Sequence, residues 1–218
     1  GGNNGGLRGK KAISFDGGLR VPFIARFPRK IPANIINSSM ASSINLMPTI
    51  AKLTGSDIPN DRKIDGKDMW LQLTSESAGS THDYVVSMKS KFIKTVHAGK
   101  WKLHARPPTF YHFPSEKSWQ NRARRDPDGK TILAPFKQPG ADEFPGLVTG
   151  DRSNNMMLFD IENDPGEQQD LSQSYPEVMA KLQKYYHDIS QQVPEIVLPM
   201  SKEYTHHKGG KLDYWNIK

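Results

Sequence analysis

Residues 7–22 read LRGKKAISFDGGLRVP, and this stretch carries the clearest functional pattern in the sequence. Two adjacent lysines follow Gly9, and an acidic residue precedes a pair of glycines. A lysine behind a glycine can approach an anion closely, and its compact ammonium charge can stabilise negative charge that develops on the oxygens of a transferred group. The same lysine pair would also fit a solvated loop with a basic surface.

Residues 19–73 contain apolar segments separated by turns. Residues 19–27 are mostly apolar and follow the Asp-Gly-Gly turn, so we expect them to form a buried strand. Residues 44–54 have apolar side chains at helical spacing, with Pro48 in the first turn and Gly55 just past the end, which predicts a helix. A loop and a short helical stretch at residues 69–73 come next.

The second half is richer in strand signals, and a Ser/Gly-rich segment at residues 74–80 separates it from the first. We expect strands at residues 84–86, 92–96, 101–104 and 156–161, a tight hairpin at Ala98-Gly99, and a helix at 176–191 that begins with Pro176. Residues 106–155 show no sustained period and predict a long loop. Connections of that length are uncommon inside compact domains unless they are functional or mobile, so the loop is a candidate binding surface.

The composition describes a folded, loop-rich chain of 218 residues with 18 glycines and 16 prolines. Lys and Arg exceed Asp and Glu by seven (30 against 23), which favours anionic partners without identifying one. There is no cysteine, so disulfides and Cys-bound zinc within the chain are excluded. No apolar run approaches the roughly 20 residues that a membrane-spanning helix requires.

The segment at residues 7–22 resembles a signature of the sulfatase family, in which a Leu-Arg-Gly-Gly-Lys stretch precedes an acidic-Gly-Gly element and Arg-Val-Pro or Arg-Glu-Pro. Four further segments resemble family elements in the same order. They are the Asp-Leu-Leu-Pro-Thr helix, Ile-Asp-Gly, the Gly-Lys-Trp-Lys strand and Leu-Tyr-Asp-Leu-x-x-Asp-Pro-Gly-Glu, at residues 44–50, 64–66, 99–103 and 158–167. The resemblance spans residues 7–192, with 106–155 as an unmatched insert.

The resemblance implies an α/β fold class. Residues 1–75 would form the end of an alkaline-phosphatase-like α/β sandwich. Residues 80–195 would form a small C-terminal α+β subdomain, in which the helix at 176–191 packs on a short antiparallel sheet. Residues 196–218 would be an irregular tail.

The resemblance also implies that the parent protein is a formylglycine-dependent sulfatase, a sulfuric ester hydrolase that acts on a sulfated carbohydrate or an aryl sulfate. In the family, hydrated formylglycine attacks sulfur and calcium neutralises the sulfate oxygens. The Cys- or Ser-x-Pro-Ser-Arg motif that yields formylglycine does not occur in this chain, nor do the acidic calcium ligands. We expect both to precede Gly1, and the 218 residues alone to be inactive.

Partners and location follow from the same resemblance. The expected partners are a sulfated small molecule or glycan and the N-terminal part of the same protein, with no membrane and no nucleic acid. Because family members are exported, a periplasmic, secreted or lysosomal location is expected.

Lys11 is the predicted catalytic residue, because its position five residues before the acidic-Gly-Gly element matches the sulfate-binding lysine of the family. Lys10, beside it, is a candidate for substrate binding. His104 and Arg106 are two more candidates, because they lie where a predicted strand enters the long loop.

Other charged residues have competing interpretations. Asp16 and Arg20 are expected to be a buried structural pair that holds the glycine turn. Arg122, Arg124 and Arg125 would hold a polyanionic substrate or lie on a solvated loop tip.

Two other functions remain open from the sequence. One is a non-catalytic polyanion-binding module, which salt-sensitive binding to heparin would favour. The other is a phosphate or phosphonate ester hydrolase of the same fold, with a Thr or Ser nucleophile and two zinc sites.

Overall fold

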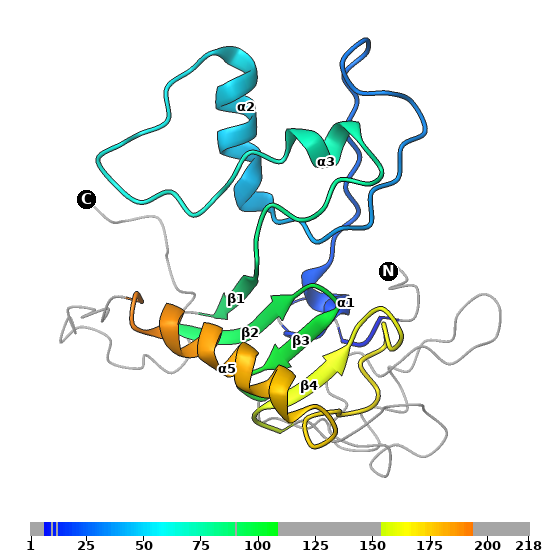
Figure 1. Ribbon diagram of the computed structural model, residues 1–218, viewed down its shortest axis with the longest axis vertical. Helices are drawn as coiled ribbons and strands as arrows, with labels where there is room; N and C mark the ends of the chain where they lie inside the picture. Colours follow the sequence, from blue (N-terminus) through cyan, green and yellow to red (C-terminus); the bar gives the residue numbers. More distant parts are fainter. Residues whose placement is uncertain (1–6, 10, 12, 90, 109–153, 194–218) are drawn as a thin grey trace, which may run out of the picture.

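The computed structural model describes residues 7–9, 11, 13–89, 91–108 and 154–193 (Figure 1). Most of the predicted long loop, including Arg122, Arg124 and Arg125, and the predicted tail therefore lie outside the described residues, as does Lys10. The described elements, in chain order, are α1 (Asp16–Leu19), a 3-10 turn (Ser43–Asn45), α2 (Leu46–Thr54), α3 (Trp70–Thr74), β1 (Val85–Lys89), β2 (Phe92–Ala98), β3 (Trp101–His104), β4 (Met157–Asp160) and α5 (Pro176–Ser190).

The four strands form one antiparallel sheet in the order β1-β2-β3-β4. Gly99 closes the tight turn between β2 and β3 at a φ of 57°, in the left-handed region that glycine tolerates and two-residue hairpins require. The predicted strands and the hairpin at Ala98-Gly99 are confirmed.

One face of the sheet is covered by α5, which lies across the strands in Figure 1. Met179 and Leu182 of the helix pack against an apolar layer that includes Val96, Leu103 and Leu158. The helix begins with Pro176, whose missing N–H costs nothing in the first turn. The predicted small antiparallel sheet with a helix packed on it is confirmed.

The opposite face of the sheet is covered by the N-terminal segment. Side chains alternate across a strand, so Lys102 and His104 of β3 point away from α5. On that face Phe159 of β4 packs with Ile13 and Phe15 in a second apolar cluster. The residues just before α1 therefore lie against strands that are about 90 to 150 positions later in the chain.

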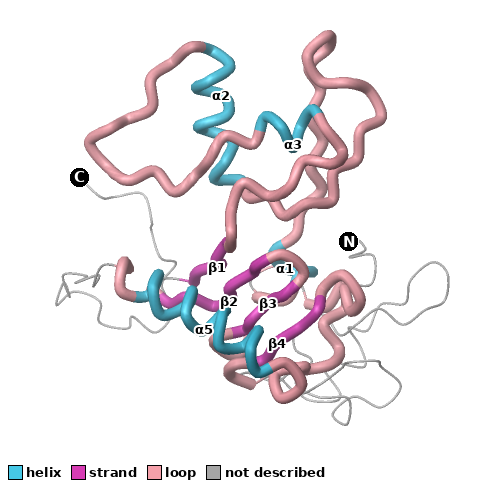
Figure 2. Tube along the Cα trace, viewed as in Figure 1, coloured by secondary structure: helices cyan, strands magenta, loops and turns pink. Residues whose placement is uncertain are grey.

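The first half of the chain is mostly loop outside α2 and α3, as Figure 2 shows. The predicted helices at residues 44–54 and 69–73 are confirmed. Gly55 ends α2 at a φ of 68°, because its left-handed conformation lets its N–H return to the last turn. Thr49 joins the two helices by accepting the backbone N–H of Met69 at 2.9 Å.

The predicted buried strand at residues 19–27 is wrong. After α1 the chain runs as an irregular segment with no strand among residues 20–42, all of which are described. Most of its large apolar side chains are exposed, and Ile24 is 91% exposed. A strand needs a neighbour for its backbone hydrogen bonds, and the four described strands pair only with one another.

Candidate functional site

Lys11 belongs to a loop whose base is closed by a backbone hydrogen bond. The N–H of Gly17 donates to the carbonyl oxygen of Arg8 at 2.8 Å. Gly9 has a φ of 81°, and a Cβ atom there would lie only 3.0 Å from the Cβ of Phe15, so the loop closes tightly on itself. The Lys11 side chain is exposed, whereas Phe15 is buried. The ammonium group of Lys11 is therefore accessible to a dissolved anion.

Beneath this loop lies a buried charge cluster on the sheet face opposite α5. Its members come from three separate parts of the chain and are Arg8, Asp16, Lys102, His104 and Glu167. Charged side chains are rarely fully buried unless they are paired. The contacts between these five residues therefore explain why they can be buried.

The carboxylate of Glu167 is the centre of the cluster. Its Oε1 lies 2.9 Å from Nζ of Lys102 and 2.6 Å from Nε2 of His104. Its Oε2 accepts the backbone N–H of Asp16 at 2.6 Å. The backbone carbonyl of the same residue accepts a hydrogen bond from the Arg8 guanidinium at 2.8 Å. One residue thus bonds to both ends of the loop that carries Lys11.

Lys102 links the two buried carboxylates. Its Nζ lies 2.6 Å from Oδ1 of Asp16, in addition to its contact with Glu167. The Arg8 guanidinium stacks over the ring of Phe15 at 4.1 Å. The cluster therefore contains two cations and two anions, and burial of charges is tolerable only where they are balanced and hydrogen-bonded.

The protonation states follow from these contacts. Burial alone would raise the pKa of Glu167, but the charge of Lys102 and the hydrogen bond from His104 outweigh it and lower the pKa to about 2. Burial lowers the pKa of His104 below 6.5, against the opposing effect of Glu167, so the imidazole is neutral at pH 7. A carboxylate only accepts, so Nε2–H of His104 donates to it. The Nδ1 atom of His104 is buried without a hydrogen-bond partner among the described residues.

Comparisons with known proteins identify the family of this chain. The sulfatase family model matches residues 1–56. The steryl-sulfatase of Mus musculus is 31% identical over 176 residues, which cover 79% of this chain and 25% of that protein. The chain belongs to the sulfatase family. The N-acetylgalactosamine-6-sulfatase of Canis lupus familiaris is 29% identical over 193 residues, covering 84% of this chain and 32% of that protein.

The fold of this sulfatase-family chain has solved counterparts. The structure of PsFucS1 sulfatase from Pseudoalteromonas sp. matches it with a TM-score of 0.60 at 20% identity, over 86% of this chain and 33% of that one. At this identity the likeness shows the fold alone. The chain spans between a quarter and a third of the length of the curated relatives named here.

The predicted substrate-binding residues lie in different surroundings. His104 is fully buried in the charge cluster, while Lys11 is exposed above it. The Arg106 guanidinium lies over the ring of Phe92 at 4.4 Å, on the neighbouring strand. The structure thus brings His104, but not the Arg106 side chain, into the charge cluster. Substrate binding by these residues and by Lys10 stays a prediction.

The predicted pair of Asp16 and Arg20 needs a correction. Asp16 is buried, as expected, but the Arg20 side chain is 59% exposed and lies 3.8 Å away. The close partner of Asp16 is Lys102. Sequence reasoning missed Lys102 and Glu167 as members of the site. The available signal was the alternation along β3, where Lys102 lies between Trp101 and Leu103 in a short strand.

The described residues do not make a metal site of the kind that sulfatases use. Among them, no group of three or more His, Asp or Glu side chains could hold an ion, and the sequence has no cysteine. The charge cluster has only two carboxylates, and both are occupied by Lys102. Separately, no described helix is long and apolar enough to cross a bilayer.

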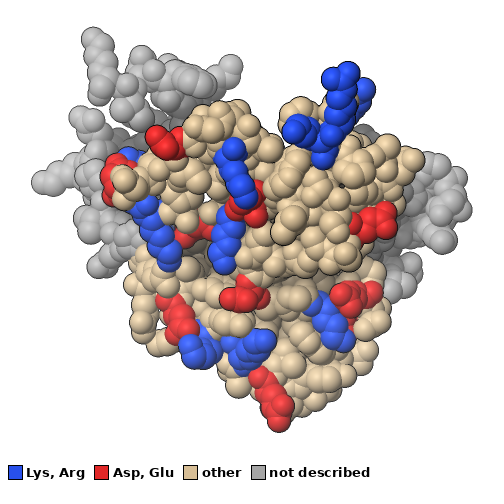
Figure 3. All heavy atoms as spheres, turned by 45° about the horizontal axis from the view of Figure 1, so that its top comes forward, with Lys and Arg blue, Asp and Glu red and all other residues tan. Residues whose placement is uncertain are grey.

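Figure 3 shows the charged side chains on one face of the described residues. Acidic and basic side chains are interspersed over most of that face, and several basic side chains stand together at its upper right.

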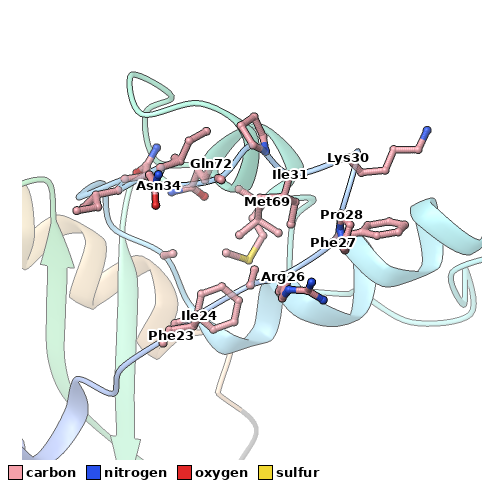
Figure 4. A pocket seen from close by; sticks show the side chains of 18 of the residues that line it. Phe23, Ile24, Arg26, Phe27, Pro28, Lys30, Ile31, Asn34, Met69 and Gln72 are labelled. Carbon is pink, nitrogen blue, oxygen red and sulfur yellow. The ribbon is translucent and has the colours of Figure 1, made fainter.

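A hollow of about 890 Å³ lies between the irregular segment after α1 and the start of α3. Its lining includes the apolar side chains of Phe23, Ile24, Ile31 and Met69 (Figure 4). Lys30 also contributes to the lining, and in this view its side chain extends away from the centre. The hollow is thus mainly an apolar surface without a cover.

Proposed function

We propose that this chain is the C-terminal part of a sulfatase that hydrolyses sulfate esters, and that Lys11 binds the sulfate group. Family membership supports the reaction class. The observation that supports the role of Lys11 is its place on a loop that leaves its side chain exposed while the loop base is held by buried hydrogen bonds to Glu167. A cation held in this way is prepared to meet an anionic group without reorganising.

The chemical task of Lys11 follows from its charge. The compact ammonium group neutralises negative charge on the sulfuryl oxygens of the bound ester. Charge on the leaving oxygen increases as the sulfur–oxygen bond breaks, so a fixed cation stabilises the transition state more than the ground state. The nucleophile and the calcium ligands are proposed to lie in the part of the protein that precedes these residues.

The proposed partner of the chain is that preceding part of the same protein. The exposed apolar side chains include Val21, Ile24 and Ile36, which are 75%, 91% and 78% exposed. Scattered apolar exposure is ordinary, but here the side chains gather on one irregular segment and around the hollow. We propose that the remainder of an alkaline-phosphatase-like α/β sandwich covers them, and that the complete protein is exported.

The proposed substrate is a sulfated carbohydrate or an aryl sulfate. Relatives carry the names arylsulfatase D and N-acetylgalactosamine-6-sulfatase, which refer to these two chemical kinds. Arg122, Arg124 and Arg125 lie outside the described residues, and a role for them in substrate choice stays a prediction.

The test uses the full-length protein, meaning the complete polypeptide that contains these 218 residues. Purified protein is incubated with 4-nitrophenyl sulfate, with a set of sulfated sugars and with 4-nitrophenyl phosphate. Inorganic sulfate and phosphate are measured by ion chromatography. We expect sulfate release at about 1 per second or faster on at least one ester. Release of phosphate alone would replace the proposal with a phosphatase, and release of neither would refute an ester hydrolase.

A further inference from the structure

Glu167 has an unusual backbone conformation for a buried charged residue. Its φ is 49°, in the left-handed region, where residues other than glycine are uncommon. The described non-glycine residues with positive φ are Arg29, Asn34, Met156 and Glu167, and of these only Glu167 is buried. Such a conformation persists only where its surroundings hold it, and it is a reason to look for a role.

The turn before Glu167 holds this conformation. The backbone N–H of Glu167 donates to the carbonyl oxygen of Asp164 at 3.0 Å. The Asp164 carboxylate then accepts the backbone N–H groups of Gln168 and Gln169 at 2.6 and 2.9 Å. The turn is fixed on both sides, so the Glu167 side chain is directed into the protein with little freedom.

The directed side chain meets the segment that carries Lys11. Oε2 of Glu167 accepts the N–H of Asp16, and its carbonyl oxygen accepts a hydrogen bond from Arg8. These two residues flank Lys11, and the hydrogen bond from Gly17 to Arg8 joins the same two ends. The base of the loop is therefore fixed to a turn about 150 positions away in the chain.

We infer that Glu167 is a positioning residue for Lys11, acting through the segment at residues 8–17. The inference rests on the proposed function, because it assigns Glu167 a part in the same site. Glu167 is fully buried, so its side chain does not reach a substrate in solvent. Its effect would therefore be to fix where the Lys11 ammonium group is held. A shift of about 1 Å in such a group can cost a factor of about 100 in rate.

The experiment is a double-mutant cycle in the full-length protein, with Glu167→Gln, Lys11→Ala and the double variant. Glu167→Gln keeps the size of the side chain and removes its charge. We expect Glu167→Gln to lower kcat for sulfate release by about 10-fold to 100-fold. In the Lys11→Ala background the same substitution should lower kcat less than about twofold, because the residue through which it acts is already absent.

Asp160→Asn is the matched control. Asp160 is also a buried carboxylate in an ion pair on the same sheet, with Lys100 at 2.7 Å, but it makes none of the bonds that hold the loop. We expect this variant to keep the kcat of the unaltered protein. If Glu167→Gln does not fold, Glu167→Asp supplies the test, since it keeps the charge but is too short to reach Asp16 and His104 together.

Amide hydrogen exchange provides a readout that does not depend on activity. In the Glu167 variant, amides at residues 8–17 should exchange at least about tenfold faster, while those of α5 keep their protection. Equal fractional losses of kcat in both Lys11 backgrounds, or unchanged exchange at residues 8–17, would overturn the inference. If the unaltered protein releases no sulfate, the proposed function fails, and the exchange measurement alone decides whether Glu167 fixes the loop.

Discussion

Oε2 of Glu167 accepts the backbone N–H of Asp16 at 2.6 Å, although the two residues are 151 positions apart in the chain. This bond joins the first family element of the sequence to the last one. The residues between them form the rest of the site, since Lys102 and His104 of β3 contact the same carboxylate. The sulfatase signature segment is thus held by the C-terminal sheet.

The stability of the protein should fall in acid because of Glu167. A folded-state pKa of about 2 against an ordinary value of 4.5 means that the unfolded chain takes up the proton first. The stabilisation is therefore present above about pH 4.5 and is lost as the pH falls towards 2. It is of the order of 3 kcal/mol. His104 adds to the decline below about pH 6.5, since burial lowers its pKa and only the unfolded state becomes protonated.

Urea unfolding of the full-length protein at a series of pH values measures this dependence. Glu167→Gln should flatten the decline between pH 4.5 and 2. Glu177→Gln is the control, because this glutamate is exposed on α5 and the variant should keep the slope. An unchanged slope in Glu167→Gln would show that the buried carboxylate is not what makes the protein acid-sensitive.

Lys102→Met should destabilise the protein strongly. Lys102 is 1% exposed and neutralises both Asp16 and Glu167, so its removal leaves two buried anions close together. Breaking a buried pair in this way costs about 3 to 5 kcal/mol. The neighbouring Lys100→Met is the control, since its pair with Asp160 is partly open to solvent and should contribute little. Thermal unfolding that shifts equally in both variants would contradict the role given to the charge cluster.

The exposed apolar segment predicts a surface that is covered in the full-length protein. Ile24→Ser and Ile36→Ser should each destabilise the full-length protein by about 2 kcal/mol or more, as expected for buried isoleucines. The same substitutions should leave the isolated 218-residue chain no less stable, or make it more soluble. Lys63→Ser, at an exposed position, is the control. Full-length variants with unchanged unfolding temperatures would show that nothing covers this segment.

The parts of the fold that local rules govern could be predicted from the sequence. The helix that ends at Gly55 and the hairpin at Gly99 depend on glycine in the left-handed conformation, which is visible as a residue type. The apolar run at residues 19–27 predicts a buried strand, but an apolar run does not show whether other strands lie beside it. Whether a strand forms depends on its neighbours, and none of the described strands is adjacent to this run.

The charge cluster could be predicted only in part. Asp16 is expected from the sequence to be buried, and it is. Lys11 is not a member of the cluster, and its role, which rests on a family pattern that is local in the chain, stays a prediction. Lys102 and Glu167 gave no comparable signal, because lysine and glutamate are almost never fully buried and their partners are far away in the sequence. Pairing over about 150 positions follows from how the segments pack together, which a local pattern does not contain.

The effect of Lys11→Ala on sulfate release shows whether Lys11 binds the sulfate group. In the full-length protein, kcat on the best sulfate ester is measured for this variant and for Lys63→Ala, which removes an exposed lysine elsewhere. We expect a loss of about 100-fold to 1,000-fold in kcat for Lys11→Ala, with the unfolding temperature unchanged, and no loss for Lys63→Ala. A Lys11→Ala protein that releases sulfate at the unaltered rate would contradict the claim that this loop binds the sulfate group.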